Sequence, residues 1–194
     1  MNTKTLAFDT VVDAESWHVP LFVRGRLSLQ KVLDGMGDWR LRPKDVPLMI
    51  RLVENPKYDV GLFAGNVGLF SHDSIHVVLG RGLLPKDEAF VIGFTMGSTK
   101  KMFRWRKSLF MFCAKHLYPE GYKFGEEERL IFNIALEAGK RCPTDLSEFD
   151  FKKYKYHSLD GLRNRLGIDK NFLRHCYEFE KKCFPNSSES QRTI

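Results

Sequence analysis

The sequence has few of the features that mark secreted or membrane-spanning proteins. No segment reaches the roughly 18 consecutive apolar residues that a transmembrane helix requires, and the mixed, partly acidic first twenty residues do not resemble a secretory or transit peptide. The four cysteines lie far apart and form no CxxC pair. We therefore expect free thiols in a reducing compartment, and a protein that lies on a membrane surface if it meets a membrane at all.

Sequence repeats and nucleic-acid-binding motifs are also missing. No similarity recurs at the periods of solenoid proteins, and there is no helix-turn-helix, zinc-finger or RNP pattern. The net charge of +7 nevertheless favours anionic partners. We therefore expect phospholipid surfaces or phosphorylated ligands as partners, and no nucleic acid.

The composition and its periodicity indicate an all-α protein with one domain. Of the 194 residues, 43% are hydrophobic and 28% are charged, which is enough for one soluble domain with a real core. Few segments alternate with period two, whereas apolar residues at helical spacing are frequent. We predict a single helical bundle over residues 21–184, after a weakly structured segment 1–20 and before a flexible tail 185–194. Helices are expected within 21–33, 61–79, 85–97, 99–118, 126–140, 158–166 and 171–184.

One apolar segment carries two of the six histidines, His72 and His76, with Asp73 beside the first. Residues i and i+4 of a helix project from one face about 6 Å apart, so both imidazoles can bind one divalent ion. The break at residues 80–82 allows the next helix to fold back and bring Glu88 to the same point. Asp73 can act as a ligand, orient a histidine or serve as a base on bound water. Such a site suits Zn or Fe(II), and with open water positions also Mg or Mn.

The same spacing has a simpler interpretation, because two histidines at i and i+4 also arise by chance in helices that only pack. A third interpretation, a metal-dependent phosphohydrolase, requires a further upstream histidine, for which His18 is a poor candidate. Only the packing interpretation leaves the histidine face without a metal.

The motif His72-Asp73-x-x-His76, followed by eleven residues and Glu88, resembles that of the coenzyme Q biosynthesis protein 4 family. The resemblance extends over residues 20–180 and is most specific between 65 and 97. It implies an all-α fold and a divalent metal, zinc first and Mg or Fe as alternatives, bound by His72, Asp73, His76 and Glu88. Asp73 and Glu88 are the implied catalytic residues.

Family resemblance also implies a function in the biosynthesis of ubiquinone or a related isoprenoid quinone. Two roles stay open: removal of the C1 carboxylate from the prenylated ring, or a non-catalytic scaffold that binds the isoprenoid and organises the quinone-biosynthesis proteins. Because no mitochondrial leader precedes the domain, we expect a bacterial relative, cytoplasmic and peripherally associated with the inner membrane. The large share of apolar residues also fits a homodimer.

A prenylated substrate requires an apolar tunnel beside the metal, since each buried CH₂ contributes about 0.8 kcal/mol to binding. The apolar and small residues nearest the motif are the candidates for its lining, although each also suits an ordinary core: Phe63, Gly65, Leu69, Phe90 and Phe94.

Two basic segments interleave cations with aromatic residues, a pattern typical of a membrane-interface helix or a site for a prenyl phosphate. A solvated face over a core stripe is the alternative for both. The first contains Lys100, Lys101, Arg104 and Arg106, and the second contains Lys152, Lys153, Lys155, Arg163 and Arg165.

Overall fold

The computed structural model describes residues 17–36, 67–99 and 124–194, and within these ranges it is helical without a strand. The predicted all-α class is confirmed for this part of the chain. The described helices are α1 Leu29–Asp34, α3 Leu69–Leu79, α4 Pro85–Ser98, α6 Glu126–Gly139, α7 Leu159–Leu166, α8 Lys170–Cys183 and α9 Ser188–Gln191, with a 3-10 turn η3 at Phe151–Tyr154.

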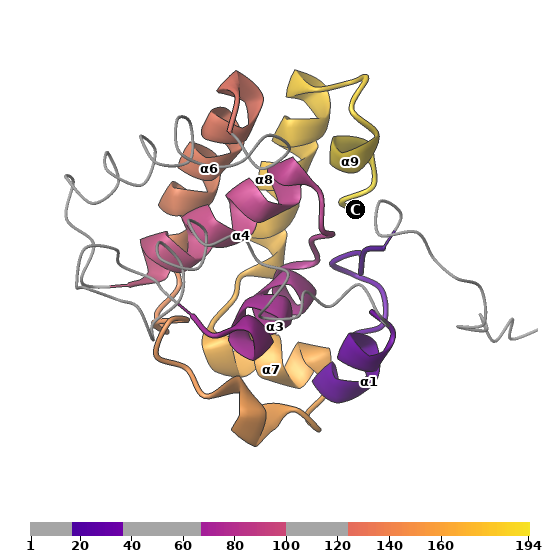
Figure 1. The fold of residues 1–194 in the computed structure, drawn as a ribbon, viewed down its shortest axis with the longest axis vertical. Helices are drawn as coiled ribbons and strands as arrows, with labels where there is room; N and C mark the ends of the chain where they lie inside the picture. The colour runs from indigo at the N-terminus through magenta and orange to yellow at the C-terminus, as the bar shows by residue number, and fades with distance from the viewer. Residues whose placement is uncertain (1–16, 37–66, 100–123) are drawn as a thin grey trace, which may run out of the picture.

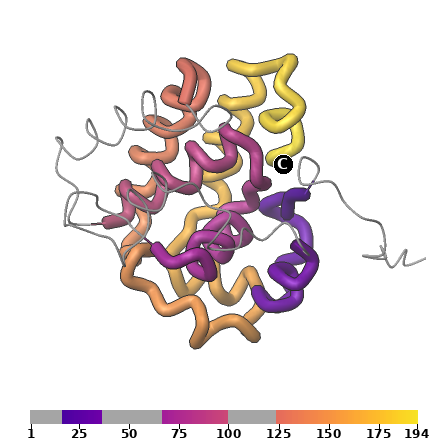
Figure 2. Tube along the Cα trace, viewed as in Figure 1, coloured from indigo at the N-terminus to yellow at the C-terminus, as the bar shows by residue number. Residues whose placement is uncertain are grey.

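Helix α3 is the central element of this arrangement (Figure 1). It contacts α1, α4, η3 and α7, while α6 packs on α4 and α8 packs on α6 and α9. All six residues from Ser74 to Leu79 are buried. Six consecutive residues point to every side of a helix, so this half of α3 is covered all round by the elements whose path Figure 2 shows.

Side chains from distant helices bind the carbonyl groups at the end of α3. Arg163 of α7 donates to the carbonyls of Val78 (2.9 Å) and Val77 (3.3 Å), and the Tyr177 hydroxyl of α8 donates to the carbonyl of Leu79 (2.6 Å). Burial raises the pKa of Tyr177 well above its usual range and keeps this donor protonated. The last four carbonyls of a helix lack partners within the helix, so these bonds allow α3 to end inside the protein.

This arrangement corrects one prediction. The sequence pattern assigned Arg163 to an exposed basic surface, but the side chain is fully buried. Arg163 lies on the face of α7 that also carries Leu159, Leu162 and Leu166, all buried. Its guanidinium binds these carbonyl groups and lies 3.5 Å from the carboxylate of Asp160, so protein groups take the place of solvent.

Helices α4 and α6 cross at glycine residues, which lets their backbones touch. A Cβ atom at Gly97 would collide with the carbonyl oxygen of Leu136 and lie 3.0 Å from its carbonyl carbon. Gly93 faces Phe132 in the same way, and Gly139 of α6 faces Phe94. The close approach fixes how α4, which carries Glu88, sits in the fold.

We expect Gly97→Ala to destabilise the protein by about 1–3 kcal/mol, as overpacking does. Alanine forms helix better than glycine by about 1 kcal/mol, so a net loss would show that the steric collision dominates. Gly68→Ala is the control, because a Cβ atom there has nothing within 4 Å, and only the weaker N-cap preference of alanine changes stability, by less than about 1 kcal/mol. Urea unfolding measures both variants, and equal stabilities would contradict the close crossing.

Described residues on both sides of the predicted domain contribute buried side chains. Trp17 and Val19, from the segment predicted to be weakly structured, are buried in the core. In the predicted flexible tail, residues 188–191 form α9, and Ser190 and Thr193 are buried. The tail is polar, so hydrophobicity does not predict its docking. Its partners are buried charged side chains of α4 and α8.

The first predicted helix is shorter than its apolar spacing indicates. Residues 21–27 form turns, with Arg24 at a φ of 62°. Helix α1 begins only at Leu29, where the Ser28 hydroxyl accepts a hydrogen bond from the Lys31 amide at 3.3 Å. The N-cap therefore sets the start of this helix.

Candidate metal centre

The end of α3 brings Glu88 back to the two histidines. Gly80 closes the helix with a φ of 75°, and a Cβ atom there would lie 2.8 Å from the Cα of Leu21. The Arg81 amide then donates to the carbonyl of His76 at 2.9 Å. After this reversal Pro85 opens α4, a position where its missing amide hydrogen is harmless. Glu88 follows in the first turn of α4.

Two imidazole nitrogens and a carboxylate converge on one point. The Nε2 atoms of His72 and His76 are 3.0 Å apart. One oxygen of Glu88 lies 3.0 Å from His72 Nε2, and the other lies 3.3 Å from His76 Nε2. Ligand atoms that bind zinc at 2.0–2.1 Å in a tetrahedron lie about 3.4 Å from one another. The three side chains therefore have the spacing of a metal ligand set, which they alone form among the described residues.

The hydrogen bond on the other ring nitrogen of His76 orients this ligand. Nδ1 lies 2.6 Å from the carbonyl oxygen of Gly82, and because a carbonyl only accepts, Nδ1 carries the proton. Nε2 is therefore the ring nitrogen that faces His72 and Glu88, and it is the atom of His76 that can bind a cation. A backbone carbonyl bound to the second nitrogen is a common outer partner of metal-binding histidines. This chemistry fits a divalent cation between the three side chains.

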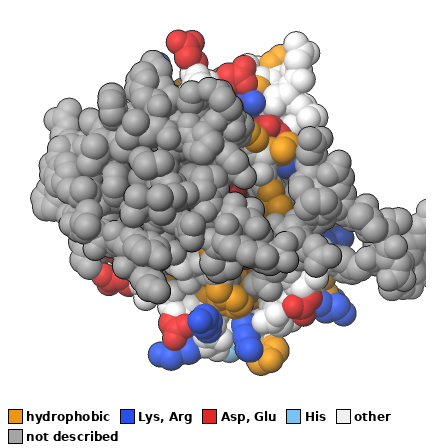
Figure 3. Space-filling view, in the orientation of Figure 1, with side chains coloured by type: hydrophobic (Ala, Val, Ile, Leu, Met, Phe, Trp, Pro, Cys, Tyr) orange, Lys and Arg blue, Asp and Glu red, His pale blue; other side chains and the backbone are white. Residues whose placement is uncertain are grey.

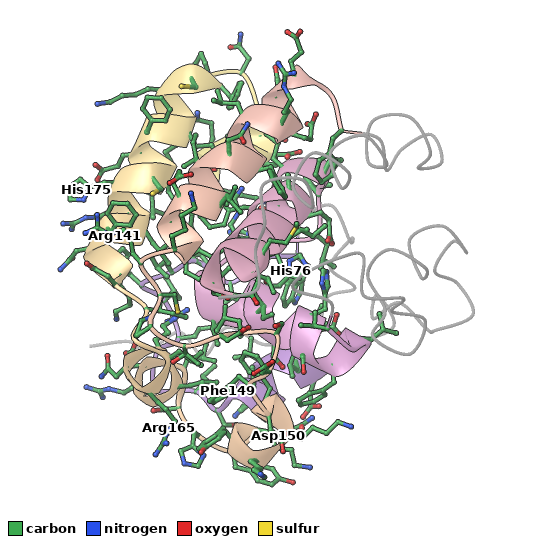
Figure 4. The ribbon with its side chains drawn as sticks, turned by 90° about the vertical axis from the view of Figure 1, so that its left-hand side faces the viewer. His76, Arg141, Phe149, Asp150, Arg165 and His175 are labelled. Atoms are coloured by element: carbon green, nitrogen blue, oxygen red, sulfur yellow. The ribbon has the colours of Figure 1, made fainter. Side chains whose placement is uncertain are left out.

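The centre is accessible from one side. His76 is completely buried, whereas the side chains of His72 and Glu88 are 18% and 28% exposed. Burial opposes ionisation of Glu88, but His76 and His72 outweigh it and hold the pKa of the carboxyl well below its usual range. Two histidines and one carboxylate leave coordination positions open, as in catalytic zinc sites and Fe(II) sites. Figure 4 shows His76 inside the protein and His175 on its outer surface.

Asp73 is not part of the clustered ligand set, although the resemblance implied four ligands. It is half-buried on α3, one residue after His72. Adjacent residues of a helix point about 100° apart, which directs Asp73 away from the face that His72 and His76 share. The structure thus brings together His72, His76 and Glu88, and the role of Asp73 stays a prediction.

Three of the residues expected to bind a lipid tail are described, and among these only Leu69 lies on the face of α3 that carries His72. It is half-buried and lies three residues before His72, on the same face of α3. Phe90 is a core residue, with its ring 5.1 Å from that of Tyr177 and 4.6 Å from the Arg81 guanidinium. Phe94 is buried and lines a small cavity toward α6 and α8, together with residues such as Phe172. Phe63 and Gly65 lie outside the described residues.

Of the two basic segments, the structure describes only the second. Lys100, Lys101, Arg104 and Arg106 lie outside the described residues. In the second segment Lys152, Lys153 and Arg165 are exposed. Figure 3 shows Lys and Arg side chains, with Asp and Glu among them, at the edge formed by the segment around η3 and α7. This edge is of mixed charge instead of uniformly basic.

Sequence reasoning missed a group of buried charges behind the metal centre. Arg81 is fully buried, pairs with Glu180 at 2.8 Å and lies 3.2 Å from Asp87. The sequence indicated only that Arg81, which lies between two glycines, belongs to the break at residues 80–82. Its partner Glu180 is 99 residues away, and no local pattern could have identified it.

Within residues 17–36, 67–99 and 124–194, none of the helices combines the length and the apolar character that a membrane span requires. Comparison of the chain with models of protein families, with curated proteins and with solved structures gives no match. The chemistry of the three clustered side chains therefore carries the functional interpretation.

Proposed function

We propose that this chain is a divalent-metal protein of isoprenoid-quinone biosynthesis, with a metal centre that binds a prenylated quinone precursor. The observation that carries the metal assignment is the convergence of His72, His76 and Glu88, with the proton of His76 fixed by Gly82. The assignment to quinone biosynthesis is supported by the resemblance of the HDxxH motif and Glu88 to the coenzyme Q biosynthesis protein 4 family.

Each side chain has a defined task in this proposal. His72, His76 and Glu88 hold the cation, zinc first and Fe(II) or Mg as alternatives. A bound divalent metal supplies a Lewis acid for an anionic group such as the ring carboxylate. For Asp73 we propose a role outside this ligand set, either orienting a histidine or acting as a base. Leu69 offers an apolar side chain three residues before His72, and the space beside Gly68 is open, since a Cβ atom there has nothing within 4 Å.

The proposed partners follow from the substrate class. A prenylated precursor or a prenyl phosphate resides at a membrane, so we propose that the protein lies on the inner-membrane surface with other quinone-biosynthesis proteins. Exposed cations such as Lys152, Lys153 and Arg165 are suited to anionic headgroups. A homodimer is part of the same proposal.

One observation favours the scaffold role over catalysis. Both oxygens of Glu88 face histidine nitrogens, so Glu88 is engaged as a ligand and is not a free base. If Asp73 does not supply a base, the centre binds the precursor without converting it.

The test begins with chelator-treated protein, to which zinc, Fe(II) or Mg is added separately. We expect one equivalent of metal to bind and to stabilise the fold by about 2.7 kcal/mol at a concentration of 100 Kd, a rise in Tm of roughly 5–10 °C for a protein of this size. Native mass spectrometry then measures binding of a prenylated hydroxybenzoate to the loaded protein. Absence of binding for all three metals would disprove the metal centre.

Release of CO₂ from the carboxyl-labelled precursor distinguishes the two roles. Metal-dependent release would establish decarboxylation, in which the ring–carboxylate bond breaks and a proton takes its place. Tight binding of the precursor without release would establish the scaffold role.

A further inference from the structure

The segment that contains α9 lies against the beginning of α4, which Figures 1 and 2 show beside it. Glu189 accepts a hydrogen bond from the Lys86 amide at 2.7 Å. Lys86 is the second residue of α4, and the first amides of a helix lack partners within it. The leucine at the N-cap, Leu84, has no polar side chain for this purpose. Glu189 thus caps the helix turn that carries Glu88.

Arg192 contacts two residues that support the metal ligands, Asp87 and Gly82. Its Nη2 atom lies 2.7 Å from an oxygen of Asp87, the neighbour of Glu88. The same guanidinium rests on Gly82, where a Cβ atom would collide with it and would lie 2.8 Å from the carbonyl of Trp17. The carbonyl of Gly82 accepts the hydrogen bond from Nδ1 of His76. Arg192 therefore packs between the two supports of the centre.

Asp87 joins this segment to the buried charges of the core. Its carboxylate is 1% exposed, accepts from the Leu84 amide at 3.2 Å and lies 3.2 Å from Arg81. Arg81 also pairs with Glu180, which accepts from the Ser190 hydroxyl at 2.9 Å.

In this group the guanidinium groups of Arg81 and Arg192 face the carboxylates of Asp87 and Glu180. Lys86 and Glu189, 3.8 Å apart, form a further pair of opposite charges beside them. Loss of Arg192 leaves Asp87 and Glu180 to share one cation in a buried place, where an unbalanced charge drives rearrangement. The turn from Gly82 to Glu88 is the part of the fold closest to that imbalance.

We propose that Arg192 is a positioning residue of the metal centre. Through Asp87 it fixes the first turn of α4 and thus the carboxylate of Glu88. Through Gly82 it fixes the carbonyl that orients His76. The inference rests on the proposed metal centre and adds a distant segment, residues 188–193, to the parts that determine metal affinity.

The test compares zinc affinity in the full chain and its variants by competition with a chromophoric chelator. Arg192→Gln is expected to weaken zinc binding by about 10–100-fold, as loss of an outer support of a metal ligand does. Through-space electrostatics predicts the opposite sign, because removing a cation favours binding of a dication. Arg192→Lys retains the charge but not the planar guanidinium group, so its zinc affinity should lie between those of the wild type and Arg192→Gln.

Two further measurements separate positioning from general stability. The control Arg129→Gln removes an exposed arginine of α6, and its zinc affinity should equal that of the wild type. The absorption spectrum of bound Co(II) should change in Arg192→Gln but not in the control. A merely structural role would lower the Tm in chelator without changing the affinity of the folded protein or this spectrum.

The outcomes are distinguishable. A wild type that binds neither zinc nor cobalt overturns the proposed function together with this inference. A wild type that binds zinc, with Arg192→Gln binding equally well or better, overturns the inference alone. If Arg192→Gln does not fold, Arg192→Lys, which retains the charge, takes its place with an expected loss of about 10-fold, and an unchanged affinity of that variant overturns the inference.

Discussion

His76→Ala is expected to abolish stoichiometric metal binding, with a fall in zinc affinity of more than about 100-fold. Loss of an outer partner of a ligand typically weakens metal binding by about 10–100-fold, and removal of the ligand itself should exceed this. His76 is the completely buried member of the set, and its Nε2 atom lies within 3.3 Å of both other ligands. Chelator competition and metal analysis of the purified variant measure the loss.

One control and one further ligand variant accompany this experiment. His175→Ala removes an exposed histidine of α8 and should retain one equivalent of metal. His72→Ala removes a ligand that is 18% exposed, so it leaves a smaller cavity and should lose the metal as well. Circular dichroism verifies that each variant is folded. Stoichiometric metal in both His76→Ala and His72→Ala would place the metal elsewhere.

Arg81→Gln is expected to destabilise the protein by about 3–5 kcal/mol, because it leaves the buried carboxylate of Glu180 without its cation and that of Asp87 with Arg192 alone. Arg81 is fully buried and binds Glu180, Asp87 and the carbonyl of Lys86. Its guanidinium also lies 4.6 Å from the Phe90 ring. Burial opposes its charge, yet Glu180 and Asp87 raise the pKa of Arg81 above its usual range, so it stays charged.

Chemical unfolding in the presence of chelator measures this effect without a contribution from metal. A loss of 3–5 kcal/mol corresponds to a fall in Tm of roughly 6–20 °C in a protein of this size. Arg174→Gln is the matched control, since Arg174 is 45% exposed and only 3.9 Å from Glu178. Such surface pairs contribute about 0–1 kcal/mol. A loss below about 1 kcal/mol for Arg81→Gln would show that water or rearrangement compensates the two carboxylates.

The helical class and the histidine pair were predictable because both depend on local periodicity. The i, i+4 spacing of His72 and His76 places them on one face of any helix that includes both. The break at residues 80–82 and the proline at 85 indicated where the chain reverses and where α4 begins, so Glu88 could be assigned to the same centre. These features need only a few neighbouring residues.

Tertiary structure alone decided which polar groups are buried together. Arg163 has the sequence context of a surface cation, yet it binds the carbonyls at the end of α3. The polar segment 188–193 reads as a frayed tail, yet it docks on Asp87, Lys86 and Glu180. The pairs Arg81–Glu180 and Asp87–Arg192 join residues 99 and 105 positions apart. A buried charge requires a partner in space, and its position along the chain does not reveal which helix supplies it.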